Sequence, residues 1–255
     1  MNRIDELFAR KESHVLSVYF TAGFPHLNDT VPIIRTLEKA GVDMIEIGIP
    51  FSDPLADGPV IQQSSQTALK NGMSLKVLFE QLRDIRKEVT VPLLLMGYLN
   101  PVLSMGMEAF CRQAAECGID GVILPDLPLQ EYEKKYKALY EKYHLHSIFL
   151  ISPQTTAERI REIDRCGTGF NYLVSTYAVT GSAKNLQASV PYFRRIRDMH
   201  LQKPSLIGFG IASRETFRLA CQYAHGAIIG SAFIKALAGE KSIEEKIHIF
   251  VESIL

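Results

Sequence analysis

Eight short apolar runs alternate with longer amphipathic segments along the chain, and this repetition restricts the fold more than any other feature. Each run has about 4 to 8 residues and is apolar on both faces, as strands of a parallel sheet covered on both sides must be. The predicted strands are Val15–Phe20, Val42–Ile49, Val91–Met96, Gly121–Leu124, Ser147–Ile151, Phe170–Ser175, Ser205–Phe209 and Gly226–Ile229.

Helical periodicity fills the segments between these runs, and several segments begin after Ser, Thr or Pro and end at Gly. The predicted helices are Thr30–Ala40, Leu75–Val89, Glu108–Cys117, Gln130–Tyr143, Thr156–Cys166, Val190–His200, Arg214–Tyr223 and Ile243–Ile254. A strand and a helix thus recur about every 30 residues, with no linker between them. We therefore predict a single closed (β/α)8 TIM barrel over residues 1–255, with an extra N-terminal helix in the charged amphipathic start. The alternative is an unusually long, doubly wound open sheet.

Composition excludes several classes of protein. The 28 basic and 28 acidic residues balance, so no electrostatic feature predicts nucleic-acid binding. No apolar run approaches the roughly 20 residues of a membrane span, and the start of the chain lacks the apolar stretch of a secretory signal. The four cysteines lie far apart without a CxxC pair, which favours buried free thiols. We expect a cytoplasmic protein.

Two carboxylates lie where chemistry occurs in a barrel, at the carboxyl ends of the strands. Glu46 alternates with Ile45 and Ile47 in the second predicted strand, so it points into the barrel if the isoleucines pack against the outer helices. A buried acid is costly unless it is paired or its pKa is raised, which favours a functional general acid over a merely hydrogen-bonded glutamate. Asp53 and Asp57 follow in a proline-rich loop; a turn-capping role is favoured for Asp53, and composition leaves both roles open for Asp57.

Glycines follow the last two strands, at the place where barrels commonly bind phosphate. Gly208-Phe209-Gly210 follows the seventh predicted strand, and Gly230-Ser231 follows the eighth and opens a helical turn. Backbone N–H groups and the Ser231 hydroxyl suit an anion. Val179-Thr180-Gly181-Ser182, after the sixth strand, is a candidate third arm of this site.

Other chemistries have no obvious residues. None of the predicted strands contains a lysine, so a strand-borne Schiff base lacks its nucleophile. Every histidine except His26 falls at a strand start or in a helix, and His144 and His146, although spaced like a metal pair, precede the fifth strand at the wrong end. A phosphate site with two carboxylates suits proton transfer, or cleavage of a bond whose leaving fragment is stabilised by protonation.

The run from Glu46 to Gln62, EIGIPFSDPLADGPVIQ, resembles the signature of the tryptophan synthase alpha subunit family. The similarity extends over nearly the whole chain, and its further motifs are Phe20-Thr21-Ala22-Gly23, Met96-Gly97-Tyr98-Leu99-Asn100-Pro101, Asp126-Leu127-Pro128, Val179-Thr180-Gly181, Gly208-Phe209-Gly210-Ile211 and Gly230-Ser231-Ala232. The long acidic and proline-containing run is highly specific, whereas the short glycine motifs are not.

The resemblance implies retro-aldol cleavage of indole-3-glycerol phosphate to indole and glyceraldehyde 3-phosphate. It makes Glu46 the acid–base residue that protonates the indole carbon and later accepts the hydroxyl proton, and it makes Asp57 the partner of the ring N–H. The indole pocket would be lined by Phe20, Met96, Tyr98, Ile123, Leu150 and Tyr172. The phosphate would be held by Gly181, Gly210, Gly230 and Ser231, and Thr180 would help close a lid over Asp57.

The resemblance also implies a partner. The family's alpha subunit works with a beta subunit that carries pyridoxal phosphate, usually as two of each, and the alpha chain itself needs no cofactor or metal. Residues around Asp53 and the stretch between Asn100 and Gly106 would lie at that interface. Thr176, Tyr177 and Ala178 depart from the family pattern by lacking a glycine, which affects the expected lid closure more than the chemistry.

Two other functions stay open at this point. One is an indole-releasing lyase that acts without a partner. The other is an inactive regulatory subunit that keeps the fold and binds only phosphate; the presence of both Glu46 and Asp57 argues against it.

Overall fold

The structure is a closed eight-stranded parallel barrel in which every strand pairs with its neighbours in chain order and β8 pairs with β1. It is a computed structural model that describes residues 1–54, 57–175 and 183–255. The strands are β1 (Val15–Thr21), β2 (Met44–Gly48), β3 (Leu93–Met96), β4 (Gly121–Ile123), β5 (His146–Ile151), β6 (Asn171–Val174), β7 (Ser205–Gly208) and β8 (Gly226–Ile229). The predicted barrel is confirmed, and the open sheet is wrong.

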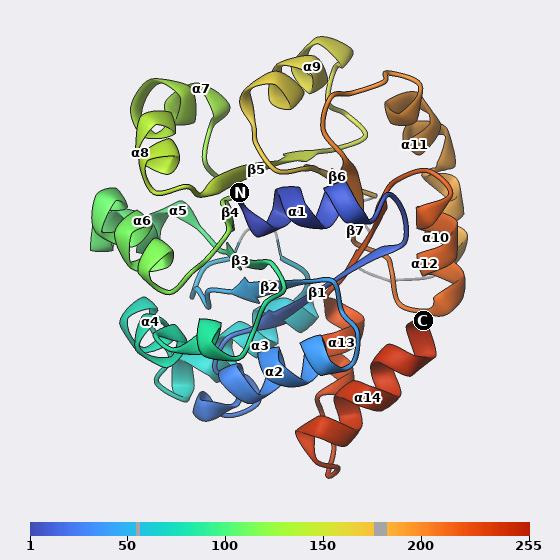
Figure 1. Cartoon of the computed structure of the whole chain (residues 1–255). Coiled ribbons are helices and arrows are strands. Elements are labelled where there is room, and N and C mark those ends of the chain that lie inside the picture. Colours follow the sequence, from blue (N-terminus) through green and yellow to red (C-terminus); the bar gives the residue numbers. More distant parts are fainter. Residues whose placement is uncertain (55–56, 176–182) are drawn as a thin grey trace.

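Helices surround the barrel (Figure 1). They are α1 (Arg3–Arg10), α2 (Thr30–Lys39), α3 (Pro59–Lys70), α4 (Leu75–Leu82), α5 (Leu99–Met105), α6 (Met107–Glu116), α7 (Leu129–Glu131), α8 (Lys137–Lys142), α9 (Ala157–Cys166), α10 (Ala183–Ala188), α11 (Val190–Arg197), α12 (Arg214–Cys221), α13 (Ser231–Ala236) and α14 (Ile243–Ile254). The 3-10 turns η1 (Leu27–Asp29) and η2 (Ile85–Lys87) and a π-helical turn, η3 (Tyr132–Tyr136), complete the set.

Several helices start where a side chain accepts a hydrogen bond from a backbone N–H that the helix itself cannot satisfy. Ser74 does this for α4, Thr156 for α9 and Ser242 for α14. At the other end of α2 and α6, Gly41 and Gly118 have positive φ angles, which glycine adopts without steric cost. The start and stop signals in the sequence therefore have the predicted structural effect.

Several helical segments differ from the sequence prediction, and α5 and α10 were not predicted. The predicted Leu75–Val89 helix ends at Leu82, and the predicted Gln130–Tyr143 helix is interrupted by the π turn η3. The helix α3 was not predicted at all, because its buried face includes Ser64, Ser65 and Ala68 and so lacks an apolar stripe.

Alternating residues of the strands pack into two separate apolar cores. On β1, Leu16 and Val18 belong to the outer core between the barrel and the helices, whereas Val15 and Tyr19 belong to the inner core inside the barrel. The inner core also takes residues from the other strands, Met44, Leu94, Met96, Ile123, Ile148, Tyr172, Val174, Leu206 and Ile228, and Phe170, which directly precedes β6. The face that a residue occupies on its strand therefore decides whether it can reach a site inside the barrel.

The helix α1 lies across the end of the barrel where the strands begin (Figure 1). Its Ile4 and Leu7 are buried and belong to the inner core. The Arg3 guanidinium donates a 3.0 Å hydrogen bond to Asp120, which precedes β4, and Arg86 pairs with the other oxygen of the same buried carboxylate. The predicted N-terminal helix is thus confirmed, and it closes one end of the barrel.

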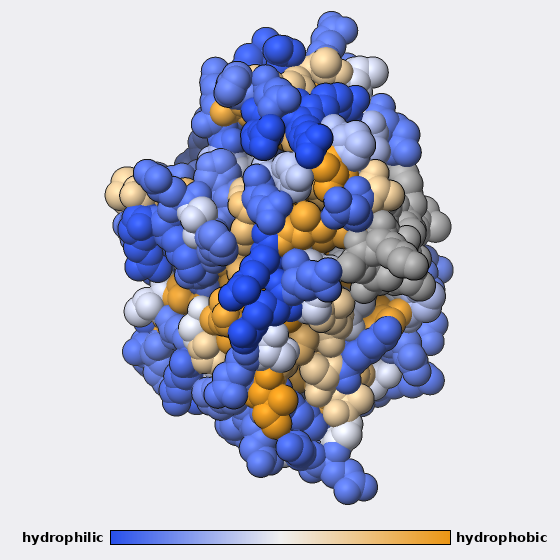
Figure 2. Space-filling model, turned by 90° about the vertical axis from the view of Figure 1, so that its right-hand side faces the viewer, coloured by the Kyte–Doolittle hydropathy of each residue, from blue (hydrophilic) through white to orange (hydrophobic). Residues whose placement is uncertain are grey.

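Polar residues dominate the face over α12 and α14, and apolar side chains reach the surface there in several groups (Figure 2). On α14 the exposed large apolar side chain is Ile249, and Leu255 follows at the end of the chain. Among the helices that the structure describes, none combines the length and apolar character that a membrane span requires.

The closure by α1 predicts a measurable contribution to stability. Replacing the buried Leu7 by Ala leaves a cavity beneath the barrel, and we expect the free energy of unfolding to fall by roughly 2 to 5 kcal/mol. The matched control is Glu6→Ala on the exposed face of the same helix, which we expect to change it little. Urea unfolding followed by circular dichroism measures both, and equal values for the two variants would contradict the packing role of Leu7.

Candidate active site

Glu46 is fully buried inside the barrel, two residues before the end of β2. In register it lies beside Tyr19 on β1 and Leu94 on β3. The Ser17 hydroxyl donates a 2.9 Å hydrogen bond to Glu46 Oε1, whereas Oε2 has no hydrogen-bond partner among the described residues. The predicted inward orientation of Glu46 is confirmed.

Burial is the dominant influence on the titration of Glu46. It raises the pKa of the carboxyl group from its ordinary value of 4.5 to about 8, because the charged form loses its hydration inside the apolar barrel. The hydrogen bond from Ser17 opposes this effect by stabilising the carboxylate. Glu46 therefore holds a proton at neutral pH and can donate it, as a general acid must.

Asp57 belongs to the loop that follows β2. Burial raises the pKa of its carboxyl group, and a hydrogen bond from the Tyr98 hydroxyl lowers it again. Gln62 on α3 holds the loop, since its Nε2 donates a 2.8 Å hydrogen bond to the Asp57 carbonyl oxygen. Asp57 is thus less buried than Glu46 and has a phenol to stabilise its ionised form, so the two carboxyl groups lie in different electrostatic environments. Asp53, in the same loop, is exposed, and the Ser52 hydroxyl donates to its carboxylate.

Two further phenols belong to the same site. The negative charges of Asp57 and Glu46 both raise the pKa of Tyr19, after the larger effect of burial, and burial followed by Glu46 does the same to Tyr172. The Tyr19 hydroxyl lies where a β-carbon on Gly48 would stand, which explains why β2 ends in a residue without a side chain. Both phenols stay neutral and can act only as hydrogen-bonding groups.

The structure tests where each predicted pocket residue lies. Met96, Ile123 and Tyr172 are buried in the inner core, and the partly buried Leu150 packs against it. Tyr98 is buried and lies over the mouth, with its ring 5.3 Å from that of Phe51. These positions bring five of the predicted side chains to the interior or its mouth; their contact with a ligand stays a prediction.

The structure corrects the prediction that Phe20 lines the pocket. Its side chain is fully buried in the outer core, together with Leu16 and Val18, and so faces the helices and not the pocket. Tyr19, one residue earlier, points into the barrel. Because side chains alternate along a strand, an error of one residue in the register moves the predicted contact to the opposite face.

Comparison with known proteins identifies the family. A family model described as tryptophan synthase alpha chain matches residues 6–253. The chain belongs to the tryptophan synthase alpha chain family. A relative with that name from Flavobacterium psychrophilum is 58% identical over 240 residues, covering 93% of this chain and 94% of its own, and one from Bacteroides thetaiotaomicron is 54% identical over 97% of both chains.

Solved structures agree with the family assignment. The tryptophan synthase subunit alpha of Legionella pneumophila is 37% identical, with a TM-score of 0.87 over 100% of this chain and 97% of that one. A chain of the tryptophan synthase complex from Pyrococcus furiosus is 32% identical, with a TM-score of 0.86 over 96% of this chain and 98% of that one. As a member of this family, the chain is an enzyme subunit.

The predicted phosphate residues that the structure describes lie at the same end of the barrel as Glu46. Gly210 has a positive φ angle just after β7, and the Ser175 hydroxyl donates a 2.7 Å hydrogen bond to the neighbouring Phe209 carbonyl oxygen. Gly230 follows β8, and Ser231 begins α13, so unpaired N–H groups of the first helical turn are available there. Gly181 and Thr180, and the departure at residues 176–178, lie outside the described residues.

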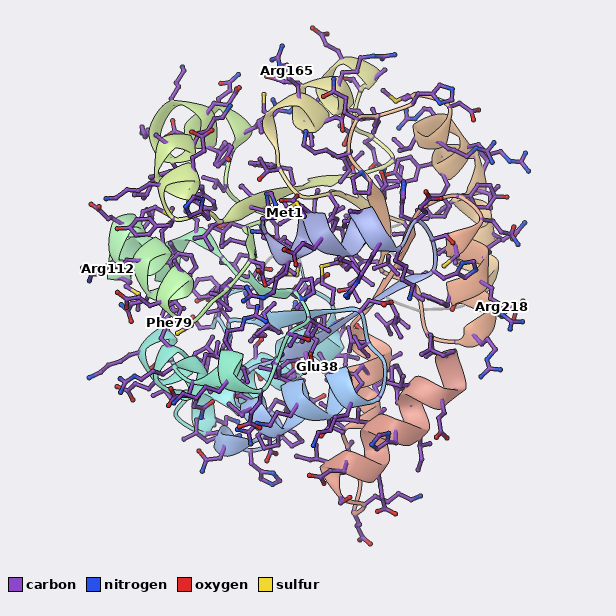
Figure 3. The ribbon with its side chains drawn as sticks, in the orientation of Figure 1. Met1, Glu38, Phe79, Arg112, Arg165 and Arg218 are labelled. Carbon is purple, nitrogen blue, oxygen red and sulfur yellow. The ribbon has the colours of Figure 1, made fainter. Side chains whose placement is uncertain are left out.

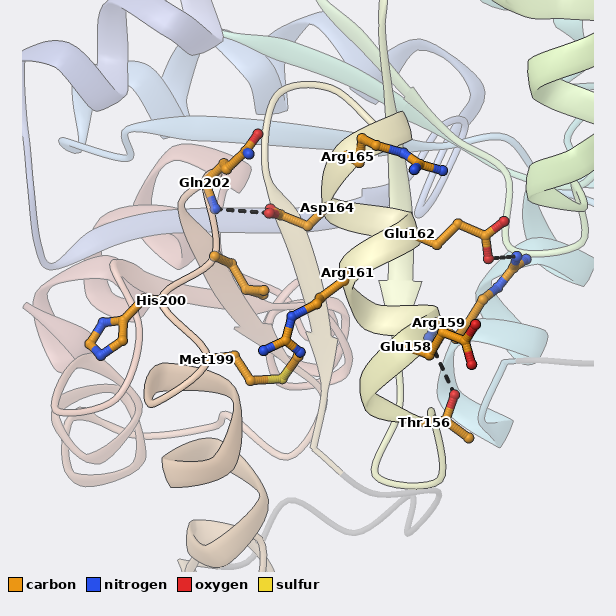
Figure 4. Close-up of a pocket in the computed structure, with 11 residues that line it drawn as sticks. Thr156, Glu158, Arg159, Arg161, Glu162, Asp164, Arg165, Met199, His200 and Gln202 are labelled. Carbon is orange, nitrogen blue, oxygen red and sulfur yellow. Dashed lines mark hydrogen bonds and ion pairs between the residues drawn. The ribbon is translucent and has the colours of Figure 1, made fainter.

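A groove of about 750 Å³ lies elsewhere, between α9 and the segment that leads into β7 (Figure 4). Three of its charged side chains have partners: Arg159 pairs with Glu162, and the Asp164 carboxylate accepts hydrogen bonds from Asn171 and from the backbone of Gln202. This groove on the outer layer is therefore separate from the mouth that contains Glu46.

The described residues contain no group of three or more His, Cys, Asp or Glu side chains that could hold a metal ion. His146, one of the pair with metal-like spacing, contacts Asp5 of α1 at 3.0 Å, at the end of the barrel opposite Glu46. Figure 3 shows the labelled side chains of Arg112, Arg165 and Arg218 at the outer rim of the helical layer.

Ser17 and Tyr19 are the site residues that sequence reasoning missed. Ser17 is a polar residue in an otherwise apolar stretch of β1. It lies two residues before Tyr19 and therefore on the same face of the strand. This pattern contains a signal, because a hydroxyl buried in an apolar interior needs a partner and Glu46 on the next strand provides one.

The raised pKa of Glu46 predicts how stability depends on pH. The folded state holds the proton up to about pH 8 and the unfolded chain only to about 4.5. The titration of Glu46 therefore does not change the stability below pH 4.5 and progressively destabilises the fold as pH rises to 8. Glu46→Gln removes this titration. We expect the free energy of unfolding of the parent to fall relative to the variant by about 2 to 5 kcal/mol between pH 5 and pH 9. Urea unfolding at both pH values measures this, and parallel changes in the two proteins would rule it out.

Proposed function

We propose that this chain cleaves indole-3-glycerol phosphate into indole and glyceraldehyde 3-phosphate, as a carbon–carbon lyase of the retro-aldol type. The observation that carries the proposal is the fully buried, protonated Glu46 inside an apolar barrel, with Asp57 in the loop above the same mouth. An acid in that state can protonate an aromatic carbon, which a hydrated carboxylate cannot do at neutral pH.

The first step is proton transfer to the ring. Glu46 donates its proton to the indole carbon that bears the glycerol phosphate chain, and the ring becomes a positively charged indolenine. Asp57 accepts a hydrogen bond from the ring N–H and stabilises that charge. The hydrogen bond from Tyr98 supports the ionised form of Asp57, which this role requires.

Bond cleavage follows on the same residue. The Glu46 carboxylate, now without its proton, accepts the proton of the hydroxyl group next to the scissile bond, and an aldehyde forms at that carbon. The carbon–carbon bond breaks, and its electron pair returns to the ring, which restores neutral indole. Glu46 ends the cycle protonated, so no external acid or base is consumed. The ring itself is the electron sink, and neither an imine nor a metal is required.

Binding is divided between two parts of the mouth. The apolar side chains of Met96, Ile123 and Leu150, with Tyr98 and Tyr172, suit a flat aromatic ring. Gly210, Gly230 and Ser231 would hold the phosphate through backbone N–H groups and a hydroxyl, together with Gly181. Thr180 would help to close a lid over Asp57.

The partner in this proposal is a tryptophan synthase beta subunit, which carries pyridoxal phosphate and consumes the indole, in an assembly of two alpha and two beta chains. The proposal is supported by an exposed apolar side chain, Leu103, within the predicted interface stretch on α5, and by the exposed Asp53. Large apolar side chains at the surface commonly mark contact sites.

The reaction is tested by replacing the acid. We expect Glu46→Gln to lower the rate of indole release by roughly 10² to 10⁴-fold, because the amide has no proton to donate to the transition state. Affinity for glycerol phosphate, measured by calorimetry, is expected to stay within a few-fold. Glu80→Gln, an exposed change on α4, is the matched control, and parent-like indole release by Glu46→Gln would refute the assignment.

The partner is tested at Leu103. We expect Leu103→Asp to reduce the stimulation of indole release by added beta subunit at least tenfold, because it places a charge in an apolar contact, while the rate of the isolated chain is unchanged. The matched control is Ile249→Asp, an exposed apolar residue on α14. A parent rate that does not respond to the beta subunit would instead favour the lyase that acts alone.

A further inference from the structure

We infer that Ser17 is a positioning residue for Glu46: its hydroxyl anchors Oε1 and thereby assigns proton transfer to Oε2. The inference rests on the proposed function for the identity of the reaction. The contact between the two side chains is independent of it.

The geometry of the pair is specific. Ser17 and Glu46 are both fully buried, and the hydroxyl lies 2.9 Å from Oε1. Ser17 pairs in register with Met44 and not with Glu46, so it reaches the carboxyl group diagonally from the next inward position of the neighbouring strand. Tyr19, which does pair with Glu46, instead extends its hydroxyl toward Gly48. The Tyr19 side chain therefore points along β2 toward Gly48, and the Ser17 hydroxyl is the group that contacts Glu46 Oε1.

The two oxygens of Glu46 are treated unequally. Oε1 has the Ser17 hydroxyl, and Oε2 is buried without a hydrogen-bond partner among the described residues. A buried polar atom without a partner is costly, and such atoms in folded proteins often have a catalytic role. A substrate atom would complete the coordination of Oε2, so Oε2 is the oxygen available for proton transfer.

An anchor is needed because the side chains that flank Glu46 along β2 and across to β3 are apolar. Met44 and Leu94, which flank Glu46 on β2 and β3, are apolar and belong to the inner core. A glutamate side chain has three rotatable bonds, and a catalytic group must be held within about half an ångström of its productive position. Alanine at position 17 would avoid the cost of burying a hydroxyl, so serine at this position is explained by its partner and not by packing.

The hydroxyl also affects the protonation of Glu46. The titratable groups that face Glu46 are the phenols of Tyr19 on β1 and Tyr172 on β6, with Asp57 in the loop beyond β2, and they are neutral or acidic. Burial raises the pKa of Glu46, and the Ser17 hydroxyl lowers it. Removing this hydroxyl therefore raises the pKa of Glu46 further, and the loss of activity at high pH, where Glu46 becomes ionised, moves upward.

The experiment compares Ser17→Ala, Ser17→Thr and the matched control Ser147→Ala in the full chain. Ser147 is a buried strand serine on β5 whose neighbour Ile148 takes the inward position. For Ser17→Ala we expect kcat for indole release to fall about tenfold with KM within twofold. The loss of activity on the alkaline side of the pH profile should move to higher pH by about one pH unit. Ser17→Thr, which restores the hydroxyl, recovers both values, and Ser147→Ala changes neither.

A second measurement does not depend on activity. Infrared difference spectra over a pH series record the carboxyl stretch of Glu46 without substrate, and Glu46→Gln identifies the band by its loss. We expect the pH at which this band loses half its intensity, the titration midpoint, to rise in Ser17→Ala and to return to the parent value in Ser17→Thr. An active parent with an unmoved midpoint in Ser17→Ala overturns the inference. An inactive parent with a shifted midpoint overturns the proposed function and leaves the Ser17–Glu46 pair intact.

Loss of folding is also informative. If Ser17→Ala unfolds under assay conditions while Ser147→Ala does not, the hydroxyl holds the barrel together and the positioning role is wrong. Thermal unfolding of each variant decides this before the kinetic measurements.

Discussion

The site depends on one costly arrangement, a carboxyl group buried in an apolar barrel and held by the Ser17 hydroxyl. Burial raises the pKa of Glu46 to about 8, so the group keeps a proton that an exposed glutamate would lose. Among the residues that the structure describes, the same burial leaves Oε2 without a hydrogen-bond partner. The raised pKa of Glu46 and the unpaired state of Oε2 among the described residues thus have a common physical origin, which is the burial of the carboxyl group in the barrel.

The rest of the fold makes this arrangement tolerable. Eight strands joined in one closed hydrogen-bonded barrel have no free edge, and the helices bury their outer faces. The barrel therefore has stability to offset an unfavourable buried acid. Asp57 lies in the loop above, where a hydrogen bond from Tyr98 favours its charged form. The strand therefore carries the more deeply buried acid, and the loop carries the acid with a phenol partner. This division suits a reaction that needs a proton donor and a stabiliser of positive charge.

Much of this was predictable from sequence because the signals are local. The eight apolar runs predicted the barrel, and the isoleucines on either side of Glu46 predicted that it points inward. Sequence reasoning failed where the answer depends on spatial neighbours. Phe20 and Tyr19 are both aromatic, and only the register of β1 shows which one faces the interior. The helix α3 was missed because its buried face is made partly of serines, and Ser17 because its partner is on another strand.

Because α1 closes one end of the barrel, it restricts the route by which substrate and product reach and leave Glu46. Ile4 and Leu7 close the barrel at the amino ends of the strands, so in the part of the chain that the structure describes Glu46 is approached from the carboxyl ends. A substrate that binds at Glu46 enters at the carboxyl ends of the strands, and its products leave there. A product released there emerges directly beside the loop after β2 and the start of α5, and a protein seated over those segments could receive it before it diffuses away.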